Sequence, residues 1–345
     1  MTSGRQVAVE PVRPSRYPSP MPPSGPSTVV DRLVVAPEIA DAIHAGRPVV
    51  ALESTLISHG LPYPANIEVA RASEAAVRAA GAIPATIAIR DGRLLVGLTD
   101  ADLEALAGTP SGTVRKAARP SLAVALEGGG WAATTVSATM IAAHAAGIRV
   151  FATGGIGGVH RGALGDAGHA AHRATLDISS DLEELARTPI AVVCAGPKAI
   201  LDVPATLEYL ETHGVPVVTI GQDELPGFYA RTLGVPAPAS VPDVAAAARL
   251  VETHLGLGSG GAILICVPIP PADALPGDIA AEAIERAIDE ADAAAVAGPA
   301  LTPWLLARIG ELTDGASIRA NTALIVNNAG VAGALAVLLA GTVPG

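Results

Sequence analysis

The feature that most restricts the fold of this chain is the alternation of short apolar runs with longer helical patterns. Val49–Leu52 (VVAL) and Ala191–Cys194 (AVVC) are unbroken apolar runs, and a segment with helical spacing of apolar residues follows each of them. Strands that are buried on both faces have such runs, and parallel strands need long connections, usually helices. We therefore expect an α/β fold with three α/β/α layers and a mainly parallel central sheet flanked by helices.

Each expected strand and helix occupies a defined range. The expected strands cover residues 47–55, 148–155, 189–196, 215–221 and 260–270. The expected helices cover residues 67–81, 133–147, 179–188, 200–214, 278–294, 303–313 and 321–341. Residues 84–98 predict a hairpin, because Asp91-Gly92 joins two β-rich runs and tolerates the positive φ angles of a type I′ turn.

Composition predicts one large folded unit preceded by a tail. Half of the 345 residues are hydrophobic and only 2% are aromatic, so Ala, Val, Leu and Ile must fill the core. Residues 1–31 are rich in Pro and Ser and lack apolar periodicity, which predicts a disordered tail. No linker-like stretch divides residues 32–345, so we expect these residues to form a single α/β/α domain.

Charge and hydropathy argue against two classes of partner. The formal net charge of −11 argues against nucleic acid, because binding a phosphate backbone needs a basic field. The most membrane-like stretch, residues 322–341, is interrupted by Asn327 and Asn328, so we expect a buried helix and no membrane span. The N-terminus has no apolar leader, so we expect a cytoplasmic protein. The only cysteines, Cys194 and Cys266, lie in apolar runs, so we expect buried thiols.

A glycine-rich segment, FATGGIGGVHRG at residues 151–162, follows one of the expected strands and resembles a dinucleotide-binding turn. That turn needs glycines at offsets of zero, two and five, but from Gly155 and Gly157 the third position falls on His160. No Gly-Lys-Ser/Thr sequence follows, so the segment is not a phosphate-binding Walker loop either. The sequence therefore predicts a glycine loop of another kind.

Polar side chains follow two of the expected strands where a parallel sheet binds its ligands. Glu53 follows Val-Val-Ala-Leu, and its carboxylate is either a capping or solvated acid or a general acid with a pKa raised by burial. Lys198 follows Val-Val-Cys-Ala-Gly-Pro, and its amine either pairs with an acid or forms a Schiff base as a nucleophile.

Other candidates are Asp177, Ser179 and Asp181, which lie on alternate residues before an expected helix. Helix capping is one interpretation, and binding of a hard divalent ion through oxygen is the other. His160 and Lys116 offer positive charge to an anion, although surface solvation explains each of them equally well.

These segments together resemble the pseudouridine-5′-phosphate glycosidases, the indigoidine synthase A-like family. The similarity is carried, in order and with family-like spacing, by VVALESTLISHGLPYPANIEVA, PATIAIRDGRLLVGL, ATTVSATMIAAHAAGIRVFATGGIGGVHRGA, DISSDLEELA, VVCAGPKAILDVPATLEYLETHGVPV and TPWLLARIGELT. It covers about residues 32–345. The resemblance implies an enzyme that reversibly cleaves the C–C bond between ribose and uracil in pseudouridine 5′-phosphate, giving uracil and ribose 5-phosphate in pseudouridine catabolism.

The resemblance also implies roles for individual residues. It makes Lys198 the Schiff-base lysine, Glu53 the proton donor and Asp177 the ligand of Mn²⁺. It implies six substrate-binding residues: Lys116, Val136, His160, Ser179, Asp181 and Asn321. Asn327 is the rival to Asn321, and the implied assembly is a homotrimer.

Three departures from the family pattern stand out. The connection at residues 163–175 is longer than the family's, the flank of Lys116 carries less charge, and the tail has no family counterpart. Two alternatives stay open: a related C-nucleotide glycosidase that acts on a different base, and a non-catalytic phosphosugar-binding protein.

Overall fold

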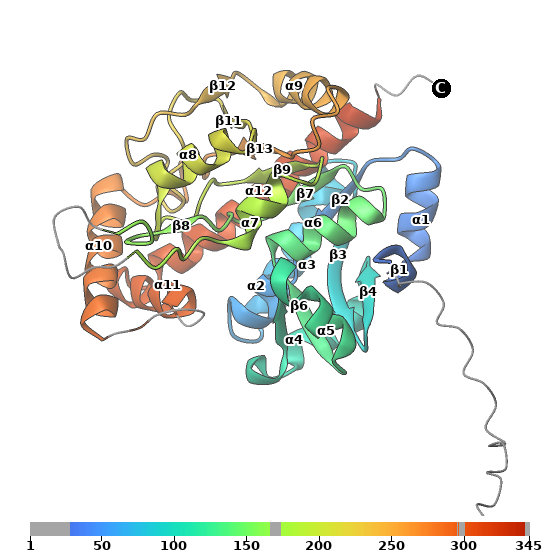
Figure 1. The fold of residues 1–345 in the computed structure, drawn as a ribbon, viewed down its shortest axis with the longest axis horizontal. Helices are drawn as coiled ribbons and strands as arrows, with labels where there is room; N and C mark the ends of the chain where they lie inside the picture. The colour runs from blue at the N-terminus through green and yellow to red at the C-terminus, as the bar shows by residue number, and fades with distance from the viewer. Residues whose placement is uncertain (1–27, 166–173, 295, 297–300, 342–345) are drawn as a thin grey trace, which may run out of the picture.

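A mainly parallel sheet forms the centre of the molecule (Figure 1). The computed structural model describes residues 28–165, 174–294, 296 and 301–341. The central strands run in the order β3-β2-β7-β9-β13-β11-β12, and every neighbouring pair among them is parallel. Their bounds are β2 (Val49–Leu52), β3 (Ile83–Arg90), β7 (Val150–Ala152), β9 (Ala191–Cys194), β11 (Val217–Ile220), β12 (Ala239–Val241) and β13 (Ile263–Cys266).

The sheet continues beyond β3 through an antiparallel part. The second half of β3 pairs with β4 (Arg93–Val96) and with β6 (Trp131–Thr134), and these two strands pair with β1 (Leu33–Val35) and β5 (Arg115–Ala117). The hairpin β3–β4 confirms the expected turn, because Asp91 and Gly92 have φ angles of 47° and 78°. The helix expected at 133–147 was wrong at its start, since Ala133 and Thr134 belong to β6.

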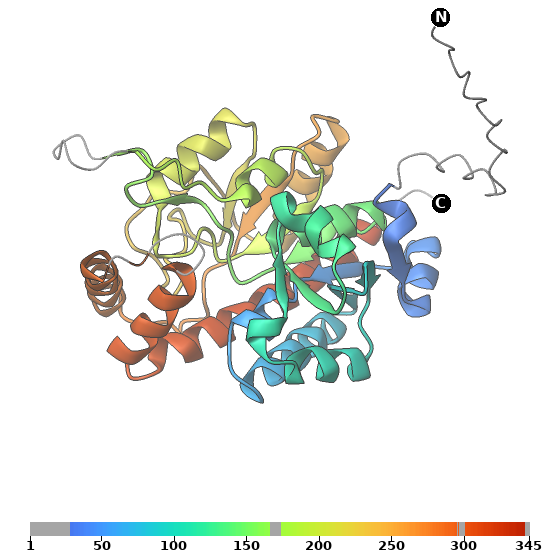
Figure 2. The same cartoon turned by 60° about the horizontal axis from the view of Figure 1, so that its bottom comes forward.

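Two helical layers cover the sheet, which confirms the expected three-layer α/β/α fold (Figures 1 and 2). Alternate strand residues face alternate layers: Ala51 packs towards α6, whereas Val50 packs towards α12. The first layer consists of α1 (Pro37–His44), α5 (Leu122–Glu127), α6 (Val136–Ala145), α7 (Ser180–Leu185) and α8 (Val203–Thr212). The second layer consists of α3 (Ala65–Ala79), α9 (Val244–Gly256) and α12 (Ala316–Ala340).

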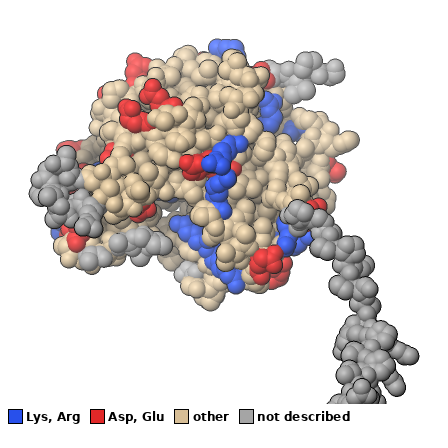
Figure 3. Space-filling view, viewed as in Figure 1, with Lys and Arg blue, Asp and Glu red and all other residues tan. Residues whose placement is uncertain are grey.

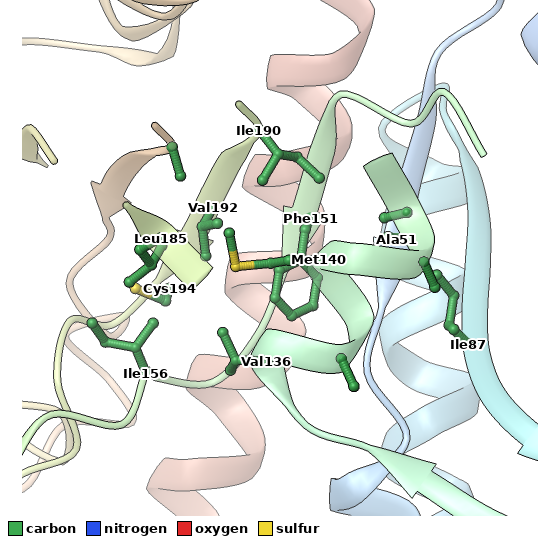
Figure 4. Close-up of a cluster of buried hydrophobic side chains, with 14 of the residues drawn as sticks. Ala51, Ile87, Val136, Met140, Phe151, Ile156, Leu185, Ile190, Val192 and Cys194 are labelled. Atoms are coloured by element: carbon green, nitrogen blue, oxygen red, sulfur yellow. The ribbon is translucent and has the colours of Figure 1, made fainter. Parts of the chain in front are cut away.

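The core of the first layer contains few aromatic residues, as the composition requires. Phe151 of β7 and Met140 of α6 pack together with aliphatic side chains and Cys194 (Figure 4). Both cysteines are buried free thiols. Helices α4 (Asp100–Gly108) and α9 were not expected from the sequence.

Helix α12 packs on β2, β7 and β9, with α3 on one side of it and α9 on the other. It is the one helix in the described ranges that is long and apolar enough to span a bilayer, and half of its most apolar window is buried. Gly333 allows the close crossing with α3, because a Cβ atom there would lie 2.7 Å from the Cβ of Ala80. This packing agrees with the expected buried helix.

A smaller helical group extends beyond the end of the sheet. Helices α10 (Gly277–Ala293) and α11 (Leu301–Leu312) pack with the N-terminal half of α12 and with the segment that follows β9. Helix α2 (Thr55–His59) and α4 lie beside α3 and β6. The remaining short elements are η1 (Val30–Arg32), η2 (Ser111–Thr113), η3 (Arg119–Ser121), and the paired strands β8 (Val159–His160) and β10 (Leu201–Asp202).

Two expected features fall largely outside the described residues. Of the expected tail, residues 1–27 are not described, and the described part ends in η1. Of the long connection at 163–175, residues 166–173 are not described.

Candidate active site

A cavity of about 280 Å³ opens at the C-terminal ends of β2, β7 and β9. Parallel α/β sheets bind ligands at this edge. Eight of the nine site residues named from the sequence line this cavity: Glu53, Lys116, Val136, His160, Asp177, Ser179, Asp181 and Lys198. Their positions span 146 residues of sequence, so the fold gathers them from six different segments.

Glu53 is the first residue after β2 and projects into the cavity. Its carboxylate accepts a hydrogen bond from the hydroxyl of Thr153, the residue that follows β7 on the neighbouring strand. Burial raises the pKa of Glu53, while the charge of Lys198 and the bond from Thr153 oppose that increase. Such a carboxyl group holds its proton at a higher pH than an exposed one, which suits a general acid.

Lys198 lies in a tight loop that follows β9. Its backbone N–H donates to the carbonyl oxygen of Ile156 at 3.1 Å, and the N–H of Ile156 donates to the carbonyl of Gly196 at 3.1 Å. Gly196 has a φ angle of +84°, which favours glycine at this turn. These two bonds fix the lysine loop to the glycine loop and hold Lys198 at the cavity.

Lys116 and Val136 line the cavity from β5 and α6. Lys116 is the middle residue of β5 and Val136 is the first residue of α6. Desolvation and then the positive charge of Lys198 lower the pKa of Lys116, although this residue stays open to solvent. Two cations in one small cavity favour an anionic ligand, since such a ligand relieves their repulsion.

The acidic segment holds three residues with different contacts. Both carboxylate oxygens of Asp181 accept backbone N–H groups, from Ser137 at 3.0 Å and from Gly157 at 3.0 Å. The hydroxyl of Ser179 caps α7 by accepting from the N–H of Asp181. No hydrogen bond or ion pair within the described ranges engages the carboxylate of Asp177, which faces the cavity. Asp181 therefore has a clear structural task, whereas Asp177 is available to a ligand.

The glycine loop packs so closely against neighbouring segments that Gly157 and Gly158 leave no room for a side chain. A Cβ atom on Gly157 would lie 2.2 Å from the hydroxyl oxygen of Ser179 and 2.9 Å from a carboxylate oxygen of Asp181. A Cβ atom on Gly158 would lie 2.4 Å from the hydroxyl oxygen of Thr206. The loop therefore lies directly against the acidic segment and α8.

The substitution Gly157→Ala should destabilise the protein by about 1–3 kcal/mol, because the added methyl group overlaps Ser179 and the loop must shift. Urea denaturation measures this loss. Gly108→Ala is the matched control, since nothing lies within 4 Å of its added Cβ atom and its φ angle is not positive. Equal stability of the two variants would contradict the close packing of the loop.

His160 enters the cavity through the pairing of β8 with β10, in which His160 lies opposite Leu201. Its backbone N–H donates to the carbonyl of Asp177 at 3.0 Å, which brings the glycine loop and the acidic segment together. Thr302 of α11 lines the same cavity and was not singled out from the sequence.

Asn321 is not among the residues that line the cavity, and neither is its rival Asn327. The neighbouring Asn328 is fully buried and donates from its amide nitrogen to the carbonyl oxygens of Thr153 and Gly154, at 3.0 and 3.3 Å. This role of Asn328 was not expected from the sequence. Asn328 anchors the start of the glycine loop to α12, beside the partner of Glu53.

A hard divalent cation such as Mn²⁺ fits the donor set only as a weakly held ion. Among the described residues, no group of three His, Cys, Asp or Glu side chains is placed to hold a metal. Asp177 offers one unengaged carboxylate in the cavity, while both oxygens of Asp181 are already used. A cation bound there would take most of its ligands from water or substrate oxygens.

Arg119 links η3 to α6 and α7 beside the cavity. Its guanidinium pairs with the buried Glu184 of α7, which also accepts from the hydroxyl of Thr188, and its backbone N–H donates to Ser137 at 3.1 Å. Figure 3 shows Lys and Arg side chains in several groups on the face turned to the viewer, with Asp and Glu side chains beside the central group.

Known proteins match most of the length of this chain. The family model described as "Indigoidine synthase A like protein" matches residues 38–338. A pseudouridine-5′-phosphate glycosidase of Methylobacterium nodulans is 53% identical over 306 residues, which cover 89% of this chain and 88% of the relative. One of Paracoccus denitrificans is 51% identical over 308 residues, which cover 89% of this chain and 98% of that relative.

Two solved structures share the fold. The prealnumycin C-glycosynthase AlnA, in complex with ribulose 5-phosphate, has a TM-score of 0.79 and 41% identity and covers 90% of this chain and 97% of its own. An indigoidine synthase A-like protein of Thermotoga maritima has a TM-score of 0.76 and 31% identity, with 89% and 96% covered. From the family match and these relatives together, the chain belongs to the indigoidine synthase A-like family.

Proposed function

We propose that this protein is a pseudouridine-5′-phosphate glycosidase, which cleaves the C–C bond between ribose and uracil to give uracil and ribose 5-phosphate. The observation that carries the proposal is that an amine, Lys198, and a buried carboxyl group, Glu53, face one small cavity that also contains Lys116. Relatives at 51–53% identity over 89% of this chain carry that name. Incubation with pseudouridine 5′-phosphate, with uracil followed by chromatography, is the direct test.

The chemistry requires more than two carboxylates, because a C–C glycosidic bond has no acetal oxygen to protonate. In our scheme Glu53 donates a proton to the ring oxygen, the ring opens, and the neutral amine of Lys198 bonds to C1′ and loses a proton. A proton delivered to the uracil carbon then breaks the C–C bond, and the nitrogen lone pair forms a C=N bond to C1′. Water hydrolyses this imine, which releases ribose 5-phosphate and the free lysine.

Phosphate recognition should come from the few cationic groups of this acidic protein. Lys116 and His160 both line the cavity, and Lys116 forms no ion pair with a carboxylate among the described residues. We expect Lys116→Ala to raise KM for pseudouridine 5′-phosphate at least about ten-fold, the scale of one lost charge-assisted bond. Steady-state kinetics on the nucleotide and on free pseudouridine check this, and equal turnover of both by the wild-type protein would refute it.

We also propose that activity needs a divalent cation, with Mn²⁺ as the metal and Asp177 as its protein ligand. When bound, the cation would supply positive charge to substrate oxygens. Because Asp177 offers one carboxylate, a chelator should abolish uracil release and added Mn²⁺ should restore it. Asp177→Ala should not recover with Mn²⁺, and full activity after exhaustive metal removal would contradict the proposal.

A related C-glycosidic activity is the second candidate, favoured by the 41% identity to a prealnumycin C-glycosynthase. Absence of uracil release together with trapping of a sugar phosphate on Lys198 would favour it. A non-catalytic phosphosugar-binding protein would show binding without trapping. The proposed homotrimer follows from the family resemblance and is tested by light scattering.

A further inference from the structure

A second carboxyl group lies behind the proposed acid. On the side of Glu53 next to α3, a void of about 10 Å³ is bordered by Glu53, Thr153, Thr86 and Ser73, with apolar side chains around them. This is about the space that one water molecule needs, and four polar side chains border it. The other residues that border the void are apolar.

Glu74 of α3 lies on the far side of this group. Its carboxylate accepts a hydrogen bond from the hydroxyl of Thr86 at 2.5 Å, and Thr86 is itself buried in β3. Burial raises the pKa of Glu74, while the bond from Thr86 and the charge of Arg78 oppose the increase. The other charges that face Glu74 are Asp100 and Glu38, and both also favour its protonated form.

We propose that Glu74 and Thr86 form a proton relay to Glu53 through one water molecule in the void. This inference rests on the proposed function, in which Glu53 gives up a proton while substrate fills the cavity and hinders its access to bulk water. The void provides a second route, on the opposite side of Glu53 from the substrate.

The relay conserves protons and electrons. When Glu74 is protonated, the hydroxyl of Thr86 turns from Glu74 towards the water. Glu74 then passes its proton to the hydroxyl oxygen of Thr86, Thr86 passes its own hydroxyl proton to the water, and the water passes a proton to the carboxylate of Glu53. The net change is one proton moved from Glu74 to Glu53, and Glu74 regains a proton from the solvent beside Arg78. Glu74 and Thr86 are thus positioning residues that act through Glu53.

The test compares Thr86→Val, which keeps the shape of the side chain and removes the hydroxyl, with Thr86→Ser, which keeps the hydroxyl. We expect Thr86→Val and Glu74→Gln to lower kcat at least about ten-fold with little change in KM, as for loss of a proton-transfer step. Both variants should show a larger solvent deuterium isotope effect and an altered pH profile of kcat. Thr86→Ser should restore wild-type behaviour.

Glu104→Gln is the matched control, because Glu104 pairs with Arg71 of α3 at 2.9 Å and its charge is not among those that act on Glu74. It should leave kcat and the isotope effect unchanged, and thermal melting should confirm that all variants fold. Wild-type kcat, pH profile and isotope effect in both Thr86→Val and Glu74→Gln would overturn the relay and leave the proposed function intact. Wild-type protein that releases no uracil would refute the proposed function and the relay with it.

Discussion

Lys198→Ala should release uracil from pseudouridine 5′-phosphate at least about 10³-fold more slowly than the wild-type protein, because no other group in the scheme can form the imine. Borohydride added during turnover should reduce the imine of the wild-type protein and leave a ribose phosphate mass increment on the peptide that contains Lys198. The Lys198→Ala protein should carry no increment. Peptide mass spectrometry and uracil chromatography measure the two results.

Lys116→Ala is the matched control for this experiment, because it removes the second lysine of the same cavity. At a saturating substrate concentration it should still be trapped on Lys198. Trapping on Lys116 in place of Lys198, or normal uracil release by Lys198→Ala, would show that the Schiff-base assignment is wrong.

Glu53→Gln should lower kcat by about 10²–10⁴-fold, the usual contribution of a positioned general acid. The same substitution should stabilise the fold at neutral pH. Because burial raises the pKa of Glu53 above 4.5, the folded protein binds this proton more tightly than the unfolded chain. Wild-type stability is therefore lost as the pH rises from about 4.5 through the raised pKa, whereas glutamine has no proton to lose.

Thermal melting of the two proteins between pH 4 and pH 8, roughly the span of carboxyl titration, should show the Tm of Glu53→Gln rising above that of the wild type as the pH increases. Glu208→Gln is a control at an exposed carboxylate of α8 and should follow the wild type. A Tm difference that does not depend on pH would contradict the burial of an ionisable Glu53.

The sequence predicted the site best for the residues that follow parallel strands. Glu53 and Lys198 follow apolar strands, and the carboxyl ends of parallel strands meet at one edge of a sheet, so their meeting could be expected. Asp177, Ser179 and Asp181 were grouped by spacing alone. The family resemblance gave them separate roles, but their contacts could not be predicted, because the backbone partners of Asp181 come from α6 and the glycine loop, which are distant in sequence.

The sequence could not predict which asparagine of α12 faces the glycine loop. Neighbouring residues on a helix point about 100° apart, so Asn327 and Asn328 differ only through the rotation of the helix about its axis. Packing against α3 at Gly333 fixes that rotation. Glu74 and Thr86 were missed for a related reason, because their pairing depends on how α3 lies on β3.

The start of β6 was misassigned because Ala and Thr carry little local information. The run Ala133–Thr134 precedes a helical pattern of small residues, and its strand form depends on pairing with β3 and β5. Propensity alone cannot distinguish these states when tertiary contacts decide.

The strand order β2-β7-β9 also sets the backbone distance between Glu53 and the segment that leads to Lys198. Leu52 pairs with Ala152 and Ala152 with Val193, so Glu53, Thr153 and Cys194 lie level on three consecutive strands. Adjacent strands are about 4.8 Å apart, so the backbone at Glu53 and the backbone that leads to Lys198 are separated by roughly 10 Å. Backbone hydrogen bonds set this spacing, whatever loops are attached around it. A change in a peripheral loop should therefore leave the width of the proposed sugar-binding gap unchanged.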